Sequence, residues 1–318
     1  MMQQTKPIST VKNYLSLVKF SHTIFALPFA IIGFFLGLYS PGGLQLNNGQ
    51  WNLNRSIGWS QHLQNSTVLT GVITRFLLVL ICMVTARSAA MAFNRYLDRN
   101  FDAQNPRTAI REIPAGIISR QSALRFVIIN AVIFMIATFF INRICFFLSP
   151  VALFVILFYS YTKRFTALCH LVLGVGLSLA PVGAYLAVTG SFALLPVLFS
   201  FAVLFWVSGF DIIYALQDEA FDKAQQLHSI PAALGKAKAL QVSRLLHLLC
   251  SCCIILAGIH GGFGAWYWLA VIVFIGMLVY QQSIVRPTDL SRVNIAFMTA
   301  NGIASVVFAV LVLLDIFL

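Results

Sequence analysis

The chain has 318 residues, of which 59% are hydrophobic and only 9% are charged, and its mean hydropathy is +0.88. A soluble domain carries about 25% charged residues, so this composition excludes a soluble protein and predicts one that crosses a membrane several times. The formal net charge of +12 is typical of basic loops beside a membrane, and we therefore expect no nucleic-acid partner.

Nine apolar segments follow one another along the chain. They cover residues 20–39, 68–97, 122–141, 144–162, 166–188, 191–216, 239–260, 264–283 and 293–316. Each is close to the roughly 20 residues that span a bilayer as a helix, and only helices satisfy the backbone of such segments in lipid. The sequence therefore predicts an all-α integral membrane protein with nine transmembrane helices in the single domain 1–318.

The basic residues set the expected orientation. With the N-terminus inside, 17 of the 21 Lys and Arg residues fall on the inner side, three fall outside and Arg87 lies within a span. The positive-inside rule then places residues 1–19 and the C-terminus on opposite sides, with the N-terminus in the cytoplasm. Segment 40–67 becomes a long extracytoplasmic loop, to which the sequence assigns no function.

The end of the second segment carries the first polar residues suited to chemistry. Asn94, Asp98 and Asp102 are spaced by four residues, so a helix places them on one face. Two carboxylates at the negative end of a helix need a cation, and oxygen ligands suit a hard ion such as Mg²⁺. Four arginines nearby favour a polyanion, and together these features indicate a diphosphate: Arg95, Arg99, Arg107 and Arg111.

The end of the sixth segment repeats this pattern. Asp218 and Asp222 are four residues apart, and Asp211 and Tyr214 lie on the same face if the helix continues. Seven of the nine acidic residues belong to these two stretches, and such residues in membrane proteins usually serve function. Two carboxylate pairs can hold two Mg²⁺ ions on opposite sides of one diphosphate. The alternative is two helix ends in salt bridges with arginines.

Three motifs together make the chain resemble the UbiA superfamily of membrane prenyltransferases. They are Asn94-x3-Asp98-x3-Asp102 with Asn105-Pro106-Arg107-Thr108-x2-Arg111, Tyr159-x-Tyr161-Thr162-Lys163-Arg164, and Asp211-x6-Asp218-x3-Asp222 continuing into His228-Ser229-Ile230-Pro231. The nine-helix plan agrees, so the resemblance covers nearly the whole chain. It implies a UbiA-type fold, with the nine helices around a central cavity.

Within that superfamily, the third motif and residues 21–29 look most like the 4-hydroxybenzoate polyprenyltransferase branch. That branch implies Mg²⁺-dependent transfer of a polyprenyl group from polyprenyl diphosphate to an aromatic acid. The setting would be the inner (cytoplasmic) membrane, in the biosynthesis of respiratory quinones such as ubiquinone or menaquinone. Dihydroxynaphthoate and haem are the rival acceptors. A cation transporter is the alternative from another class, although arginines would repel a permeating cation and transporter sites tend to lie near the midplane.

The resemblance also assigns roles to residues. It places Asn94, Asp98 and Asp102 in one Mg²⁺–diphosphate half-site and Asp218 and Asp222 in the other. Basic side chains would then hold phosphate oxygens through charge-assisted hydrogen bonds, and the candidates are Arg99, Arg107, Arg111, Lys163 and Arg164.

Two further residues lie deeper in the membrane than these motifs. Arg87 precedes Asn94 by seven residues, and an arginine at that depth is costly unless paired. It either holds an aromatic carboxylate, reaches the diphosphate or pairs with a neighbouring helix. Asp211 is a candidate to accept a hydrogen bond from a phenol, and either Asp211 or the departing diphosphate removes the ring proton. His22 and His228 are further candidates for polar pocket residues.

Overall fold

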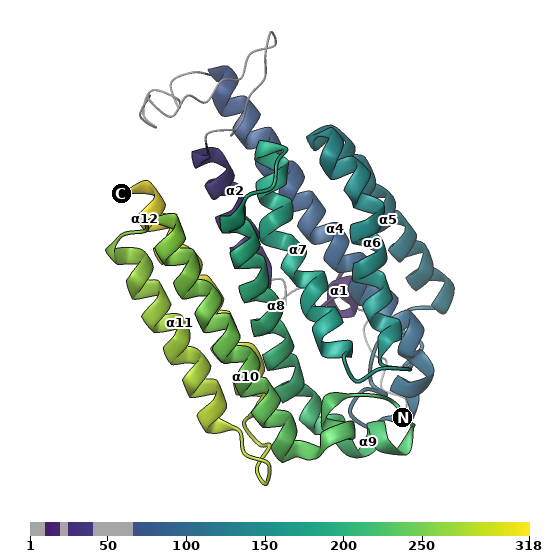
Figure 1. Ribbon diagram of the computed structural model, residues 1–318. Helices are drawn as coiled ribbons and strands as arrows, with labels where there is room; N and C mark the ends of the chain where they lie inside the picture. The colour runs from purple at the N-terminus through teal and green to yellow at the C-terminus, as the bar shows by residue number, and fades with distance from the viewer. Residues whose placement is uncertain (1–9, 20–24, 41–65) are drawn as a thin grey trace.

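The computed structural model describes residues 10–19, 25–40 and 66–318, which form a bundle of helices (Figure 1). The helices are α1 (Thr10–Leu17), α2 (Leu27–Tyr39), α4 (Ser66–Gln104), α5 (Arg120–Ile141), α6 (Arg143–Thr162), α7 (Cys169–Thr189), α8 (Leu194–Ala215), the 3₁₀ turn η2 (Leu216–Asp218), α9 (Glu219–Ala224), α10 (Ile230–Gly261), α11 (Ala265–Ile284), the π-helix η3 (Ile295–Ala300) and α12 (Asn301–Phe317). His22 and most of the predicted loop 40–67 lie outside the described residues.

The membrane spans confirm the predicted class of protein. Within the described ranges, eight helices are long and apolar enough to cross a membrane, and the 13-residue α2 is a shorter apolar helix where the first span was expected. Many large apolar side chains are exposed on the outside of the bundle, for example Phe147 and Ile272. A lipid environment accounts for such a surface, whereas water would not.

Two helices extend further than hydropathy predicts. α4 continues to Gln104, and α10 begins at Ile230 with a first turn that a kink at Gly235 (φ 77°, ψ 164°) separates from the rest, whereas the apolar segments were expected to end at 97 and to begin at 239. A helix satisfies its own backbone and so does not stop where the apolar side chains stop. Asn105-Pro106 follows the end of α4, and the Ser229 hydroxyl caps α10 by accepting from the backbone N–H of Ala232 at 3.3 Å.

Small residues allow the central helices to approach one another closely. α8 packs between α7 and α10, and α2 packs on α7. A Cβ atom at Gly33 of α2 would lie 2.1 Å from the carbonyl oxygen of Pro181 in α7, and one at Gly174 would lie 2.3 Å from the Ser208 hydroxyl in α8. These contacts fix the positions of the two helices, α7 and α8, that flank the second acidic stretch.

The two ends of the helix bundle are formed by different parts of the chain. The end of α4, α9 and the start of α10 lie at one end, whereas α12 finishes at the other end (Figure 1). The two groups of acidic residues therefore lie at the same end of the bundle.

The α2–α7 contact gives a test of this packing. Gly33→Ala should destabilise the protein by about 1–3 kcal/mol, because the added methyl group has to displace backbone atoms. Gly183→Ala on α7, where an added Cβ meets nothing within 4 Å, should be neutral or stabilising because alanine is the better helix former. Thermal unfolding in detergent measures both, and an equal effect of the two substitutions would contradict the packing described.

Candidate active site

One cavity of about 290 Å³ collects nearly all of the residues predicted from the motifs. It is lined by α4, the segment 105–111, α6 with the turn that follows it, α7, α8 and α9. Twelve of the thirteen predicted site residues line it: Arg87, Asn94, Asp98, Asp102, Arg107, Arg111, Lys163, Arg164, Asp211, Tyr214, Asp218 and Asp222. Segments up to 135 positions apart in the sequence, from Arg87 to Asp222, thus share one cavity.

The first acidic group lies on unbroken helix. α4 remains helical from Ser66 to Gln104, so Asn94, Asp98 and Asp102 keep the common face that their spacing predicts. The amide of Asn94 donates to Oδ2 of Asp98 at 3.2 Å. Asp102 is buried, with 6% of its surface exposed.

The second acidic group lies on a broken helix, which differs from the continuous face considered from the sequence. α8 ends at Ala215, the 3₁₀ turn η2 ends at Asp218, and α9 carries Asp222. The tighter turn changes the direction in which the later side chains point. Asp222 is fully buried, and its Oδ2 accepts a hydrogen bond from the Ser229 hydroxyl at 2.8 Å.

Arg107 links the two groups. Asn105 Oδ1 accepts from the backbone N–H of Arg107 at 3.0 Å and thereby fixes the turn after α4. The guanidinium of Arg107 donates from Nε to Asp218 Oδ1 at 3.1 Å and from Nη2 to Asp218 Oδ2, which is a bidentate pair. Its Nη1 donates to the Tyr214 hydroxyl at 2.9 Å.

Every other predicted metal-binding carboxylate is also paired with a basic side chain from a different segment. The N–O distances are 2.7 Å for Arg111–Asp102, 2.7 Å for Lys163–Asp222 and 3.0 Å for Arg164–Asp98. Burial alone would lower the pKa of the Lys163 ammonium, but the Asp222 carboxylate outweighs it and holds that pKa above its usual value.

This pairing neutralises the site, and it bears on how a cation would bind there. Among the residues that the structure describes, no three acidic, His or Cys side chains are already gathered around one point for a metal ion. Oδ2 of Asp102 is buried and has no hydrogen-bond partner, so this carboxylate oxygen has its lone pairs free. Mg²⁺ binds through a few carboxylates and completes its shell with water and phosphate oxygens, so this donor set fits it.

The deeper part of the cavity has a different composition. Nε of Arg87 is buried and has no hydrogen-bond partner. Asp211 precedes Asp218 by seven residues, and its Oδ2 is 2.7 Å from Nδ1 of His170. Phe25, Phe210 and Phe297 also line the cavity, so this region combines two polar groups with aromatic walls.

Two of the predicted residues that the structure describes do not line the cavity: His228, which is exposed, and Arg99. Its Nη1 donates to the carbonyl oxygen of Tyr96 at 2.9 Å, and its guanidinium lies 5.4 Å from the centre of the Tyr96 ring. Arg95, which the sequence grouped with the same polyanion, does line the cavity, but it is 3% exposed and pairs with Glu112 at 3.4 Å. Phosphate binding by Arg99 stays a prediction without a contact that supports it.

Three polar residues of the site have no role in the sequence analysis. His170 contacts Asp211, Ser229 contacts Asp222, and the Asn105 amide donates to Asp218 Oδ1 at 3.3 Å. A histidine in an otherwise apolar span was a usable signal for His170. Ser229 and Asn105 stand in the motifs quoted above, but the motifs do not indicate which acid each side chain contacts, because these contacts join distant segments.

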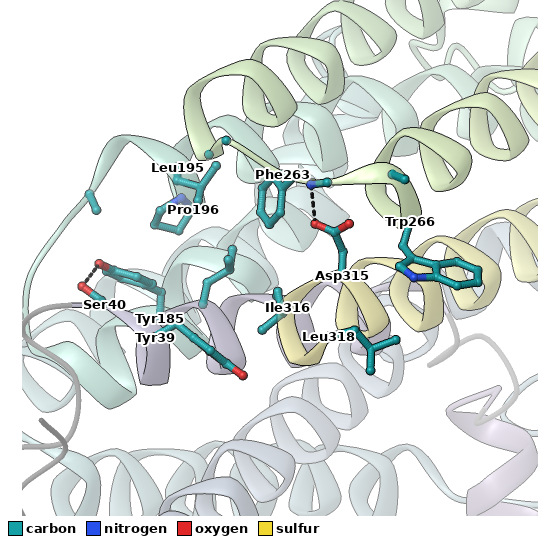
Figure 2. A pocket seen from close by; sticks show the side chains of 16 residues that line it. Tyr39, Ser40, Tyr185, Leu195, Pro196, Phe263, Trp266, Asp315, Ile316 and Leu318 are labelled. Atoms are coloured by element: carbon teal, nitrogen blue, oxygen red, sulfur yellow. Dashed lines mark hydrogen bonds between the residues drawn. The ribbon is translucent and has the colours of Figure 1, made fainter. Parts of the chain in front are cut away.

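A larger cavity of about 700 Å³ lies near the C-terminal end of α12 (Figure 2). Its one carboxylate, Asp315, accepts from the backbone N–H groups of Gly264 at 2.8 Å and Tyr267 at 3.1 Å, and so caps the start of α11. The described residues that line it include no Lys, Arg or His. The smaller cavity is therefore the candidate active site, since described acidic and basic side chains converge in it and not in the larger one.

Comparisons with known proteins agree with this geometry. The profile of the UbiA prenyltransferase family matches residues 62–303. The chain is 32% identical over 234 residues to a 4-hydroxybenzoate octaprenyltransferase of Nitrosomonas europaea, which covers 74% of this chain and 80% of the relative. It is also 32% identical over 232 residues to the 4-hydroxybenzoate octaprenyltransferase of Aeromonas salmonicida, covering 71% and 78%.

Solved structures show the same fold. An apo structure of a UbiA homologue from Aeropyrum pernix K1 has a TM-score of 0.75 at 28% identity and covers 92% of this chain and 98% of that one. A UbiA homologue from Archaeoglobus fulgidus bound to GPP and Mg²⁺ has a TM-score of 0.68 at 19% identity, with 96% and 100% covered.

Fold and site together define a multi-pass membrane protein with a buried, charge-paired cavity. The chain belongs to the UbiA prenyltransferase family. It is accordingly an enzyme, a transferase of prenyl groups, as the sequence motifs predicted.

The Lys163–Asp222 pair predicts how this protein binds a divalent cation alone. Lys163→Met should strengthen Mn²⁺ binding in the absence of diphosphate by about tenfold, because the ammonium no longer competes for the carboxylate. The same substitution should weaken the binding of inorganic diphosphate.

Lys223→Met is the matched control, since Lys223 pairs with Glu219 and is 53% exposed outside the cavity. Calorimetric titration of both variants measures the two affinities. Unchanged Mn²⁺ affinity in Lys163→Met would show that the ion pair does not oppose metal binding.

Proposed function

We propose that this enzyme transfers a polyprenyl group from polyprenyl diphosphate to a ring carbon of an aromatic acid in a Mg²⁺-dependent reaction, with 4-hydroxybenzoate as the acceptor. The observation that carries this proposal is the set of four acid–base pairs around one cavity. Acids alone suit a metal and bases alone suit an anion, but the two together suit a metal diphosphate. The names of the relatives at about 30% identity support 4-hydroxybenzoate.

The basic side chains provide the binding site for the diphosphate. Arg107, Arg111, Lys163 and Arg164 already line the cavity, and each exchanges its carboxylate partner for phosphate oxygens when the substrate binds. The exchange keeps every charge paired, which a buried site requires. Asn94, Asp98 and Asp102 would hold Mg²⁺ on one side of the diphosphate and Asp218 and Asp222 on the other, and the bound metal would supply neutralisation of the charge that grows on the leaving group.

The walls of the cavity suit the organic half of the reaction. Departure of diphosphate leaves an allylic cation on the prenyl group, which must be kept from water. Phe25, Phe210 and Phe297 line the cavity, and the rings of Tyr214 and Phe297 are 4.2 Å apart between centroids. Aromatic faces attract a cation and exclude water at the same time.

The two deeper polar groups account for the acceptor. Arg87 precedes Asn94 by seven positions, about 10 Å along α4, and Asp211 lies on α8, before the break that leads to Asp218. In this proposal the Arg87 guanidinium binds the carboxylate of the acid, and Asp211 accepts a hydrogen bond from its hydroxyl, which makes the ring more nucleophilic. The Nε of Arg87 that lacks a partner is available for such a bond.

The cellular setting follows from the same proposal. Most Lys and Arg residues were predicted on the side of the membrane that holds the two acidic stretches. The cavity then faces the cytoplasm from the inner membrane, and the product enters the biosynthesis of a respiratory quinone. The prenyl chain reaches the cavity from the lipid.

Removal of either acidic group tests the proposal directly. Asp98→Ala and Asp218→Ala should each lower Mg²⁺-dependent product formation by at least about 10²-fold, because the leaving diphosphate loses its stabilisation. Asp289→Ala is the control, since Asp289 lies on an exposed turn and accepts from the backbone N–H of Ser291 at 2.9 Å. Purified variants are supplied with labelled prenyl diphosphate and with 4-hydroxybenzoate, dihydroxynaphthoate or haem. Full activity of either site variant would refute the proposal, and product only with dihydroxynaphthoate or haem would refute the acceptor.

The role of Arg87 is tested with a neutral acceptor. The wild type should prefer 4-hydroxybenzoate over its methyl ester in kcat/KM, because only the acid offers a carboxylate to the guanidinium. Arg87→Gln should lower kcat/KM for the acid by about 10–100-fold, which corresponds to the free energy of a charge-assisted hydrogen bond. The value for the ester should stay nearly unchanged. An equal loss with both acceptors would assign Arg87 to the diphosphate or to the fold instead.

A further inference from the structure

His170 is buried beside the acceptor end of the cavity. It lies in the first turn of α7, has 3% of its surface exposed and places Nδ1 2.7 Å from Oδ2 of Asp211. The backbone N–H of Ile230 points at its other ring nitrogen, Nε2, at 3.4 Å. Because Nε2 accepts there, the ring proton belongs on Nδ1, which then donates to the Asp211 carboxylate.

The surroundings hold the ring in this orientation. The Ser208 hydroxyl of α8 donates to the carbonyl oxygen of His170 at 3.1 Å. One turn further along α7, Gly174 lies so close to α8 that a Cβ atom would be 2.6 Å from the carbonyl oxygen of Leu204. α7 and α8 thus pack closely at the level of the His170–Asp211 pair, which fixes the distance between the two backbones that carry it.

The contact also joins the two ends of the site through consecutive residues. Ser229 donates to Asp222 in the diphosphate end, and Ile230 donates to His170 in the acceptor end. The cap of α10 therefore orients one group in each half. A histidine that served packing alone would need neither the hydrogen bond from Ile230 nor the contact with Asp211.

We propose that His170 is a positioning residue for the acceptor, which acts by holding Oδ2 of Asp211 so that the other carboxylate oxygen, Oδ1, meets the phenolic hydroxyl. This inference rests on the proposed function, because it concerns the acceptor site. His170 lines the cavity, and in this role it acts through Asp211. A misplaced carboxylate would still bind substrate but would align poorly with the ring.

The test separates the hydrogen bond from the bulk of the ring. The amide of His170→Asn reaches the position of Nδ1 and retains a donor to Asp211. His170→Gln reaches the position of Nε2 instead and loses that donor, and His170→Leu loses both. With prenyl diphosphate and 4-hydroxybenzoate, kcat should fall about 10²-fold in the Leu and Gln variants and less than about fivefold in Asn. KM for prenyl diphosphate should stay within about twofold in all three, and thermal unfolding in detergent identifies any variant that fails to fold.

A double-mutant cycle shows whether His170 acts through Asp211. The variant carrying both His170→Gln and Asp211→Asn should be no slower than Asp211→Asn alone, since residues that act as one unit are not additive. Multiplying losses, or an Asn variant no better than Gln, would overturn the inference and leave the proposed function intact. A wild-type enzyme that prenylates no phenolic acid would refute the proposed function and this role of His170 with it.

Discussion

The pairing of four acids with four bases is the interaction on which the charged end of this bundle depends. Two helix ends bring carboxylates into one cavity, where their mutual repulsion would be unfavourable without cations. Segment 105–111 and the turn at 163–164 supply those cations. The same ion pairs hold both segments over the cavity, so the positions of these loops and the charge balance of the site depend on each other.

The same pairs explain how a charge-rich site can exist beside lipid. Asp102 and Asp222 are buried, whereas the side chains of their partners Arg111 and Lys163 are 25% and 33% exposed, so each base can change partner only if its carboxylate gains another cation. A metal diphosphate offers a cation to each carboxylate and an anion to each base. In the proposed function, substrate binding therefore rearranges charges that are already paired, and no isolated charge has to be buried.

Sequence alone predicted the elements and the grouping of the site, because both depend on local patterns. Hydropathy located the spans, and the four-residue spacing of Asn94, Asp98 and Asp102 placed them on one face. The sequence did not predict the break at Leu216–Asp218 or the extension of α4 to Gln104, because both depend on turns and caps. Nor did it predict which base meets which acid, or the contact of His170 with Asp211, because these arise from packing between segments far apart in the chain.

Arg99 illustrates the same limit from the opposite direction. Its place in the motif suggested phosphate binding, yet one helical turn decides which way a side chain faces, and Arg99 turns to Tyr96. Arg87 and Asp211, by contrast, line the cavity as their positions two turns deeper predict. Position along a helix is thus more informative for the buried residues than for those at the rim.

The central claim is that metal and diphosphate bind together by exchanging partners with existing ion pairs. Calorimetric titration of Mg²⁺ into the purified protein, with and without a non-reactive prenyl thiodiphosphate, measures this coupling once the affinity of Mg²⁺ for the free analogue is known. The account predicts weak Mg²⁺ binding alone, at least about tenfold tighter binding with the analogue, and the same factor for the analogue in the presence of Mg²⁺. Equal Mg²⁺ affinity with and without the analogue would contradict it.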